Sequence, residues 1–415
     1  MSEKKIRLGV VGVGRGAYLA QTAVRVGMDV VAICDNAWPE RLAQLGKQHG
    51  ATTYADYDGF LEHDMDAVLL ANFFHQHAPF AIKALEAGKH VMSECIACKT
   101  LGEGAALARA VEKSGRIYMF AENYAYTACV QEMRRLYKDG EIGEIRYAEG
   151  EYNHPITDPD GLLRISPGVN HWRHICPSTY YCTHAMSPIM FVTDRRPVSI
   201  NAQSIALCDN DNYGIHLKRN DPGSVMIIRM DNGSIARLFG LWLKGHSIWY
   251  RFHGTRGLME NLRTLNGGYL RVLHESSDVA PGEPKERIYA PEFPVHADLA
   301  SAAGHGGGDF FVNYCFAEAI RKNEQPYMDV YRGLDMSLIA MQGWRSCLTN
   351  GEPFEIPDFR NEETRKRYEN DHWSPFPEDR APGQPWPSIT GEVKPSEEAL
   401  EHARKIWDQM GYKGK

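Results

Sequence analysis

The sequence predicts an α/β protein in two parts: an N-terminal Rossmann domain with a doubly wound parallel sheet, and a C-terminal α/β domain with an open, largely antiparallel sheet. Three observations support this fold class. The chain has 415 residues, more than the roughly 150 of an ordinary domain. Its first third alternates short apolar runs with helix-like stretches, which is typical of βαβ units. Beyond that, apolar and polar residues alternate roughly, as in the strands of a more open sheet.

The predicted elements of the first part follow one another without a break. Each apolar run is short enough for a strand, and each stretch between two runs is long enough for a helix. The predicted strands are 6–11, 30–34, 67–71, 90–93 and 117–120. The predicted helices are 17–26, 40–49, 78–87 and 101–113. We assign residues 1–123 to this domain.

The second part, residues 124–356, is expected to hold a sheet with helices on one face. A helix is predicted at 128–138, and two more at 309–322 and 334–349, where apolar residues fall at helical spacing. The predicted strands are 145–153, 199–207, 224–230, 234–243 and 248–253, with turns at 231–233 and 254–257. Residues 357–415 are rich in Pro, Trp and charge, so we expect a tail that wraps the surface and ends in a helix at 396–410.

Composition and charge limit the class of protein. Charged residues make up 24% of the chain and hydrophobic residues 43%, as in globular domains. The 46 Lys and Arg stand against 53 Asp and Glu, without a basic block, which argues against a nucleic-acid partner. No apolar run is long enough to span a membrane. The nine scattered cysteines and a start that lacks the features of a signal peptide predict a cytoplasmic protein.

A glycine-rich turn follows the first strand and opens the first helix. Its glycines and Arg15 read Gly12-Val-Gly14-Arg15-Gly16. Gly12 suits a tight turn, and Gly14 lets a pyrophosphate approach the backbone at the N-terminus of the helix. We therefore predict that Gly12, Gly14, Arg15 and Gly16 bind a dinucleotide.

Asp35 ends the second predicted strand, eighteen residues beyond Ala17. A carboxylate at this place accepts hydrogen bonds from the ribose hydroxyls and repels a 2′-phosphate, so NAD is favoured over NADP. The alternative is a similar fold that binds no nucleotide.

Two further motifs indicate a family. Residues 72–77 read Asn-Phe-Phe-His-Gln-His, and residues 88–96 read Gly-Lys-His-Val-Met-Ser-Glu-Cys-Ile. The chain resembles the Gfo/Idh/MocA oxidoreductases, which carry Thr-Pro-Asn-x-x-His and Gly-Lys-His-Val-x-x-Glu-Lys-Pro at these places. The resemblance implies NAD as the cofactor, bound with the help of Asn72, His77, Glu94 and Asn123.

The chain departs from that family at two catalytic positions. Cys95 stands where the family has a lysine, and Tyr180 stands four residues before His184, where the family has an aspartate. These departures count against a simple alcohol dehydrogenase. Cys95 and Cys98 form a lone Cys-x-x-Cys pair without the second half of a zinc site, so we predict no metal.

The departures resemble those of the NAD-dependent glycosidases of glycoside hydrolase family 109. Those enzymes also lack the lysine, and they carry a Glu-Asn pair, a Tyr-x-x-His motif and a Gly-His-Gly-Gly-x-Asp motif. Here the three motifs are Glu122-Asn123, Tyr181-Cys-Thr-His184 and Gly304-His305-Gly-Gly-Gly-Asp309. The resemblance implies oxidation of the third sugar hydroxyl, elimination of the glycosidic substituent, addition of water and return of the hydride.

His184 is the predicted general base or acid, because imidazole titrates near neutral pH. Tyr181 would lie one turn away on a helix, and Tyr180 competes with Tyr181 for the catalytic role. The alternative is that all three pack structurally. Glu122 is expected to bind sugar hydroxyls or to cap the first helix of the second domain.

Four more residues complete the predicted substrate site. His305 is expected to face the substrate, while Asp309 fixes the start of its helix as an N-cap. Trp172, Arg173 and His171, in a loop-like stretch, suit stacking on a sugar and hydrogen bonding to it, although a buried Trp anchor fits equally well.

Three functions remain open at this point. The first is the NAD-dependent glycosidase just described, acting on a small-molecule sugar or glycoside. The second is a conventional NAD-dependent sugar or polyol dehydrogenase, and the third is a non-catalytic regulator that binds a sugar or nucleotide. We further expect a homo-oligomer, because the open sheet face pairs subunits in the family that this chain resembles.

Overall fold

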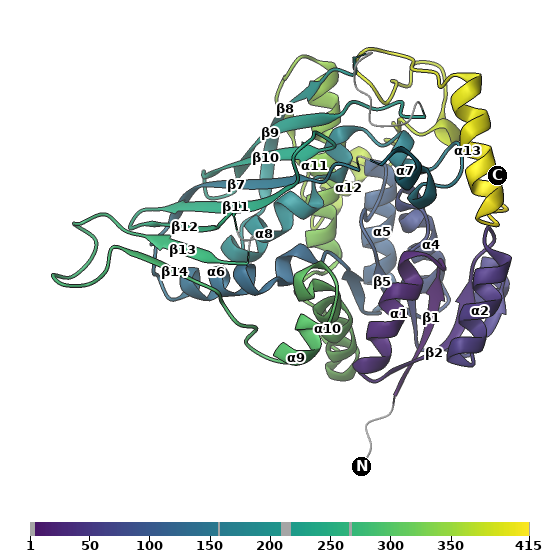
Figure 1. The fold of residues 1–415 in the computed structure, drawn as a ribbon, viewed down its shortest axis with the longest axis horizontal. Coiled ribbons are helices and arrows are strands. Elements are labelled where there is room, and N and C mark those ends of the chain that lie inside the picture. Colours follow the sequence, from purple (N-terminus) through teal and green to yellow (C-terminus); the bar gives the residue numbers. More distant parts are fainter. Residues whose placement is uncertain (1–4, 157, 209–216, 265–267, 415) are drawn as a thin grey trace.

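The computed structural model describes residues 5–156, 158–208, 217–264 and 268–414. It contains two sheets, one of six strands and one of nine. In Figure 1 the smaller sheet with its helices lies at the lower right, and the larger sheet fans out to the left. The predicted fold class is confirmed.

The six-stranded sheet is wholly parallel and has the order β3-β2-β1-β4-β5-β6. Its strands are β1 (Ile6–Val11), β2 (Met28–Cys34), β3 (Thr52–Tyr54), β4 (Ala67–Leu70), β5 (His90–Ser93) and β6 (Tyr118–Phe120). Its helices are α1 (Arg15–Arg25), α2 (Pro39–His49), α3 (Tyr57–Leu61), α4 (His77–Glu86) and α5 (Leu101–Ser114). The order reverses between β1 and β4, so the carboxyl ends of these two strands form the crevice where a dinucleotide binds in such folds.

The nine-stranded sheet has the order β14-β13-β12-β11-β7-β10-β9-β8-β15. Of its described strand pairs only β7 and β10 run parallel. The strands are β7 (Ile145–Asn153), β8 (Pro197–Ile205), β9 (Gly223–Met230), β10 (Ile235–Leu241), β11 (Ser247–Gly254), β12 (Leu258–Asn261), β13 (Leu270–Leu273), β14 (Glu286–Tyr289) and β15 (Phe354–Glu355). The sheet is thus largely antiparallel, as predicted.

Helices cover one face of the large sheet. Helix α8 (Thr183–Thr193) packs on β7, β10 and β11, and α11 (Val330–Leu348) packs on β8. Along β9 buried and exposed residues alternate, so the face opposite these helices is left to solvent. The remaining helices are α6 (Ala128–Lys138), α7 (Pro159–Ile165), α9 (Ala297–Ser301), α10 (Gly308–Lys322), α12 (Glu362–Tyr368) and α13 (Glu397–Gln409).

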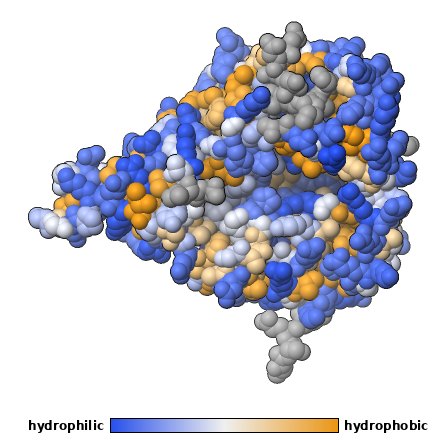
Figure 2. Space-filling model, in the orientation of Figure 1, coloured by the Kyte–Doolittle hydropathy of each residue, from blue (hydrophilic) through white to orange (hydrophobic). Residues whose placement is uncertain are grey.

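Helices from the second half hold the Rossmann sheet in place. Helix α10 packs on α1, and α11 packs on α5 and β6. The tail returns to both halves, with α12 against α5 and α13 against α7. The division at 1–123, 124–356 and 357–415 stays a proposal. Figure 2 shows the surface hollowed between the Rossmann half and the strands above it.

None of the described helices is long and apolar enough to cross a bilayer. The cytoplasmic location stays a prediction.

Candidate active site

The glycine-rich turn between β1 and α1 leaves room for a phosphate pair. Gly12 has φ +94°, and a Cβ there would come within 2.4 Å of the carbonyl oxygen of Ala71. A Cβ on Gly16 would come within 2.9 Å of a methyl carbon of Val10. A Cβ on Gly14, by contrast, would meet no described atom within 4 Å. Because helix α1 begins at the next residue, its N-terminal amides border this open space. The turn therefore fits the pyrophosphate of NAD.

Asp35 joins this turn to the end of β2. One carboxylate oxygen accepts a hydrogen bond from the amide of Val13 at 3.0 Å, and the other accepts from the amides of Ala37 and Trp38. The side chain is half-buried, so free lone pairs remain for ribose hydroxyls. At the end of β4, both side-chain polar atoms of Asn72 are buried without a hydrogen-bond partner in the described part of the chain. These donors and acceptors also fit a dinucleotide.

Asp35→Ala is expected to weaken NADH binding about tenfold and to narrow its preference over NADPH. The variant loses both the acceptors for the ribose and the charge that opposes a 2′-phosphate. Fluorescence titration with both nucleotides measures the effect. Asp29→Ala is the matched control, since Asp29 lies on the same strand but pairs only with Lys5 at the surface. An unchanged ratio of the two affinities would refute the assignment of Asp35.

His184 lies at the centre of a hydrogen-bonded chain. Its Nδ1 is 2.8 Å from a carboxylate oxygen of Glu122, and its Nε2 is 3.3 Å from the hydroxyl of Tyr181. The Nδ1 hydrogen thus points to Glu122, which leaves Nε2 as the acceptor toward Tyr181. Glu122 follows β6, Tyr181 ends the 3₁₀ helix η4 (Ser178–Tyr181), and His184 lies in the first turn of α8. Three separate elements therefore build the chain.

The protonation states of Glu122 and Tyr181 favour proton transfer at His184. Burial opposes ionisation of Glu122, but the adjacent imidazole and its hydrogen bonds hold the pKa of the carboxyl below its ordinary value. Burial raises the pKa of Tyr181, so its hydroxyl stays protonated at neutral pH. The site thus holds a carboxylate that stabilises imidazolium, a base and a hydroxyl donor.

The structure corrects the role predicted for Glu122. Its side chain is fully buried, and it accepts hydrogen bonds from His184, from the amide of Tyr124 and from the thiol of Cys95. With no exposed surface it cannot bind a sugar hydroxyl, nor does it cap α6. It orients His184 from behind, as the buried acid does in other carboxylate–histidine pairs.

Cys95 takes the place of the family lysine and adds a thiol to this cluster. Its Sγ donates to Glu122 at 3.1 Å, and burial raises the pKa of the thiol well above its ordinary value. The sulfur, the carboxylate and Nδ1 of His184 lie within 4.8 Å of one another, a spacing that could also hold a metal ion. The hydrogen bonds already account for all three atoms, so we keep the prediction that no metal takes part.

Prolonged dialysis against EDTA is therefore expected to leave activity and melting temperature unchanged. A neutral thiol and a carboxylate engaged with imidazole bind Zn²⁺ poorly, because each ligand must first give up a proton or a partner. Elemental analysis of the purified protein provides the second readout. One equivalent of zinc that leaves together with activity would contradict this prediction.

A second network joins the two halves of the chain. Arg15 donates to Glu94 at 2.6 Å and to both carboxylate oxygens of Asp309 at 2.6 and 2.9 Å. Asp309 also accepts from the side-chain amide nitrogen of Asn123 at 2.9 Å and lies 2.8 Å from Nδ1 of His305. Four predicted ligands are thus brought together: Asp309 joins Arg15, Asn123 and His305, and Glu94 is joined to them through Arg15.

Asp309 does not cap its helix as predicted. Helix α10 begins one residue earlier, after Gly307, and no side chain accepts from its first amides. The Asp309 carboxylate turns instead to Arg15 on α1, which is a stronger, charge-assisted partner than a backbone amide. His305, which is 40% exposed, packs against Tyr124 at the rim of the His184 cluster.

Aromatic rings form a wall beside His184. Trp172 stacks on Phe74 with ring centres 4.5 Å apart and lies 5.3 Å from Tyr181. Tyr181 in turn stacks on Trp242 at 6.2 Å. The guanidinium of Arg173 lies 4.2 Å above the Trp172 ring. Trp172 and Arg173 are therefore placed next to the Tyr181 hydroxyl, where a sugar face could stack.

Two predicted residues lie apart from this cluster. Tyr180 is fully buried, and its hydroxyl donates to the carbonyl oxygen of Lys99 at 3.3 Å while its ring packs on Trp344. The structure thus brings Tyr181, and not Tyr180, to His184. His77 is also buried and bonds the carbonyl oxygen of Ile96, and burial lowers its pKa to about 4, so it positions the Cys95 segment as a neutral ring.

Tyr124 and Tyr152 are site residues that the sequence did not reveal. Their rings lie 4.7 and 4.6 Å from that of His184. Tyr124 directly follows the predicted Glu122-Asn123 pair, which could have drawn attention to it. Tyr152 lies on β7 and carries no motif that sets it apart from the other tyrosines among the 20 in the chain.

Family models match three consecutive stretches of the chain. Residues 6–122 match the oxidoreductase family with an NAD-binding Rossmann fold, and residues 130–260 match a Gfo/Idh/MocA C-terminal domain. Residues 243–368 match the C-terminal domain of glycosyl hydrolase 109. The NAD-binding Rossmann domain is thereby shown.

Curated relatives and solved structures agree with these matches. A glycosyl hydrolase family 109 protein of Saccharopolyspora erythraea is 25% identical over 89% of this chain and 86% of its own. One of Stenotrophomonas maltophilia is 25% identical over 86% and 89%. Levoglucosan dehydrogenase in complex with NADH and L-sorbose has a TM-score of 0.72 at 20% identity, covering 86% of this chain and 100% of that one.

An inositol dehydrogenase homologue from Azotobacter vinelandii, solved with NADH and myo-inositol, has a TM-score of 0.68 at 19% identity, with 85% of this chain and 98% of that chain covered. At such identity these structures support the fold, while the matched domains and the full-length relatives support the family. The chain carries the NAD-binding and C-terminal domains of the Gfo/Idh/MocA oxidoreductases, and over most of its length it is similar to the glycosyl hydrolase family 109 proteins.

Proposed function

We propose that the protein is an NAD-dependent glycosidase that cleaves a glycoside through transient oxidation of the third sugar hydroxyl, elimination, addition of water and re-reduction. The observation that carries this proposal is the chain from Glu122 through His184 to Tyr181, set beside Cys95 in the place of the family lysine. The relatives that carry the family 109 name support the same conclusion.

Glu122, His184 and Tyr181 each take a different part in proton transfer. When bound, NAD supplies a hydride acceptor that can later return the hydride to the sugar. His184 accepts the hydroxyl proton at Nε2, directly or through Tyr181, and Glu122 stabilises the imidazolium that forms. After the imidazolium has released that proton to water, the neutral imidazole takes the proton from the carbon beside the new carbonyl, because a carbonyl acidifies that bond. Tyr181 can donate a proton to the departing glycosidic oxygen and regain one from the imidazolium.

Cys95 separates this proposal from the dehydrogenase alternative. A buried thiol whose pKa lies well above the ordinary value is neutral at pH 7 and brings no positive charge to the reacting hydroxyl. A lysine at this place would bring such a charge. The acid–base work is therefore left to His184 and Tyr181, and both steps of an elimination can use them.

The deciding experiment incubates the protein with NAD and a panel of aryl glycosides. Aglycone release and the absorbance of NADH are followed together in one cuvette. We expect release of the aglycone without accumulation of NADH, and no release from protein stripped of NAD. Growth of NADH in step with substrate loss would instead establish a dehydrogenase, and binding without either signal would favour a regulator.

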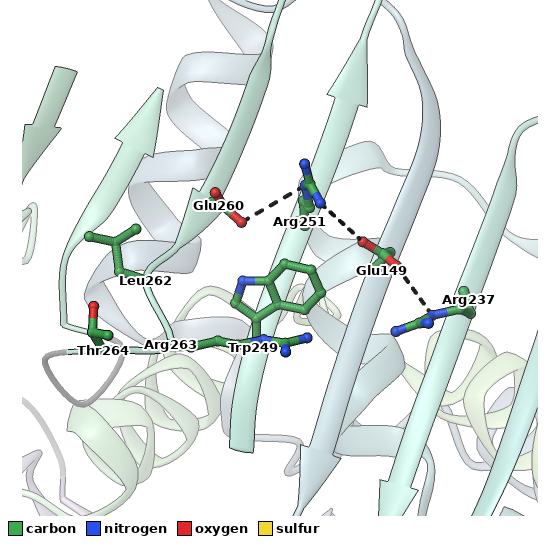
Figure 3. A pocket seen from close by; sticks show the side chains of 8 residues that line it. All are labelled: Glu149, Arg237, Trp249, Arg251, Glu260, Leu262, Arg263 and Thr264. Carbon is green, nitrogen blue, oxygen red and sulfur yellow. Dashed lines mark ion pairs between the residues drawn. The ribbon is translucent and has the colours of Figure 1, made fainter. Parts of the chain in front are cut away.

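We also propose that the open face of the large sheet pairs two copies of the chain. Figure 3 shows acidic and basic side chains from adjacent strands facing one another there, around a shallow pocket of about 550 Å³ beside Trp249. Glu149 forms an ion pair with Arg237 at 3.2 Å, and Glu260 forms one with Arg271 at 3.0 Å. A face with alternating charges can meet a rotated copy of itself with opposite signs in contact.

Light scattering after size exclusion is expected to give a multiple of 46.8 kDa. Arg237→Glu places a third acid beside Glu149 and Glu151 and should shift the mass toward the monomer by repulsion. Arg367→Glu, at an exposed site on α12, serves as the control. A mass of 46.8 kDa for the unmodified protein would remove the proposal.

A further inference from the structure

Arg173 holds a positive charge beside the catalytic cluster without a counter-ion. It lies in the 3₁₀ helix η3 (Trp172–His174) and is half-buried. Its guanidinium carbon is 4.2 Å from the ring centre of Trp172 and 5.9 Å from that of Tyr181. Within the described part of the chain it forms no ion pair, and its guanidinium donates no hydrogen bond to protein. The charge is thus held in place by two aromatic rings.

Three other partly or fully buried arginines in this protein are paired with acids. Arg15 pairs with Glu94 and Asp309, Arg345 with Asp371, and Arg365 with Glu112. This is the usual arrangement, because a cation withdrawn from water needs a partner. The five donors of a guanidinium match a carboxylate or phosphate in two-pronged geometry. Arg173 has that capacity, and no protein group uses it.

The surroundings of Arg173 favour an anion further. The Nζ of Lys218 lies 3.7 Å from the ring centre of Trp242, which stacks on Tyr181. Burial, followed by the nearby charge of Arg173, lowers the pKa of Lys218, so the positive charge beside Tyr181 is that of Arg173 and Lys218 adds a nitrogen donor. The ring of His154 lies 5.9 Å from that of Tyr152 and 5.1 Å from that of the exposed His246.

The two acids whose charges act on Tyr181 already have partners within the protein. They are Glu94 and Glu122, and they bind Arg15 and His184 respectively. Burial lowers the pKa of His154, followed by the charges of His246 and Arg173, so His154 offers a neutral ring and adds no negative charge. The wall beside Tyr181 is therefore positive on balance.

We propose that Arg173 binds an anionic group of the substrate, a carboxylate or a phosphate or sulfate ester, so that the sugar acted on is an acidic one. This inference rests on the proposed function for the position of the sugar ring next to His184. Tyr181 connects the two, since its hydroxyl meets Nε2 of His184 while Arg173 lies over its ring. An acidic substituent on the sugar can therefore meet Arg173 while a ring hydroxyl meets the base.

Calorimetric titration of the NAD-saturated protein tests this without any turnover. The probes are D-glucuronate and glucose 6-phosphate against glucose, and D-galacturonate and galactose 6-phosphate against galactose. We expect at least one acidic sugar to bind about tenfold or more tightly than its neutral parent. The carboxylate and phosphate arms show which anion is preferred, and inorganic phosphate and sulfate show how much the anion contributes alone.

Variants assign the effect to the guanidinium. Arg173→Gln should weaken binding of the acidic sugar about tenfold more than binding of its neutral parent, so that the preference for the acidic sugar is lost. Arg173→Lys should keep a part of the preference, since it retains the charge but not the two-pronged geometry. Arg367→Gln is the matched control, an exposed arginine over the ring of Tyr368 on α12.

The inference is overturned if no acidic sugar binds more tightly than its parent, or if Arg173→Gln weakens acidic and neutral sugars equally. NADH affinity of each variant, measured beforehand, ensures that the site is folded. Loss of the proposed function has a different signature: the acidic preference persists while aryl glycosides are oxidised with accumulation of NADH.

Discussion

Replacing His184 by alanine is expected to lower turnover by a factor of about 10² to 10⁴, the usual contribution of a general acid–base group, while NAD remains bound. The imidazole is the only group that links the buried Glu122 carboxylate to the Tyr181 hydroxyl among the described residues. Without it, neither the hydroxyl proton nor the carbon-bound proton has an acceptor. The glycine-rich turn and Asp35 lie on the other half of the chain, so NADH affinity should change less than twofold.

The two adjacent tyrosines provide a matched pair for this test. Tyr181→Phe removes the hydroxyl that bonds Nε2 of His184 and should lower turnover at least tenfold. Tyr180→Phe removes a hydroxyl whose one hydrogen bond to described residues is to the carbonyl oxygen of Lys99, so it should cost about 1 kcal/mol of stability and little activity. Steady-state rates, with NADH titration as the folding control, measure all three variants. If His184→Ala retained turnover near that of the unmodified protein, the site would lie elsewhere.

The fold was predictable where burial sets a strong local pattern. Ile6–Val11 and His90–Ser93 are short stretches that are buried at all but one residue, and both are strands with the bounds expected from the sequence. The short strands β3 and β12 to β14 were not predicted. Thr52–Tyr54 and Glu286–Tyr289 are largely exposed edge strands, and the hydrogen bonds to a neighbour that define them leave little trace in hydrophobic pattern.

The sequence predicted which residues form the site better than it predicted what each of them does. His184 and Glu122 were both singled out, yet they lie 62 residues apart, and no local signal reveals that one supports the other. Tyr180 and Tyr181 are neighbours in sequence, so only the geometry of the 3₁₀ helix decides which hydroxyl reaches His184. In the same way, the position of Asp309 in the sequence suits a helix cap, but its carboxylate binds Arg15, which is 294 residues away and is a stronger partner.

Asp309→Ala is expected to destabilise the protein by about 3 kcal/mol, the lower end for breaking a buried ion pair. The carboxylate is fully buried, while Arg15 keeps 27% of its side-chain surface and its second partner Glu94, which softens the loss. Asn123 and His305 lose an acceptor as well. Because Arg15 lies at the start of α1, the variant should also bind NADH more weakly. Asp58→Ala, which breaks the exposed pair with Lys83, should change stability by less than about 1 kcal/mol.

The charge of Asp309 also predicts how stability depends on pH. Burial opposes its ionisation, but the hydrogen bonds and charge of Arg15 prevail and hold the pKa of this carboxyl well below its ordinary value. A depressed pKa in the folded state means that the stabilisation is present above the unfolded value of about 3.9 and is lost as the pH falls below it. Urea unfolding at pH 7 and pH 3 should therefore show a smaller acid-induced loss for Asp309→Asn than for the unmodified protein. Equal losses in the two proteins would mean that the Arg15 pair contributes no stability, and the link between the two halves would then depend on the packing of α10 against α1.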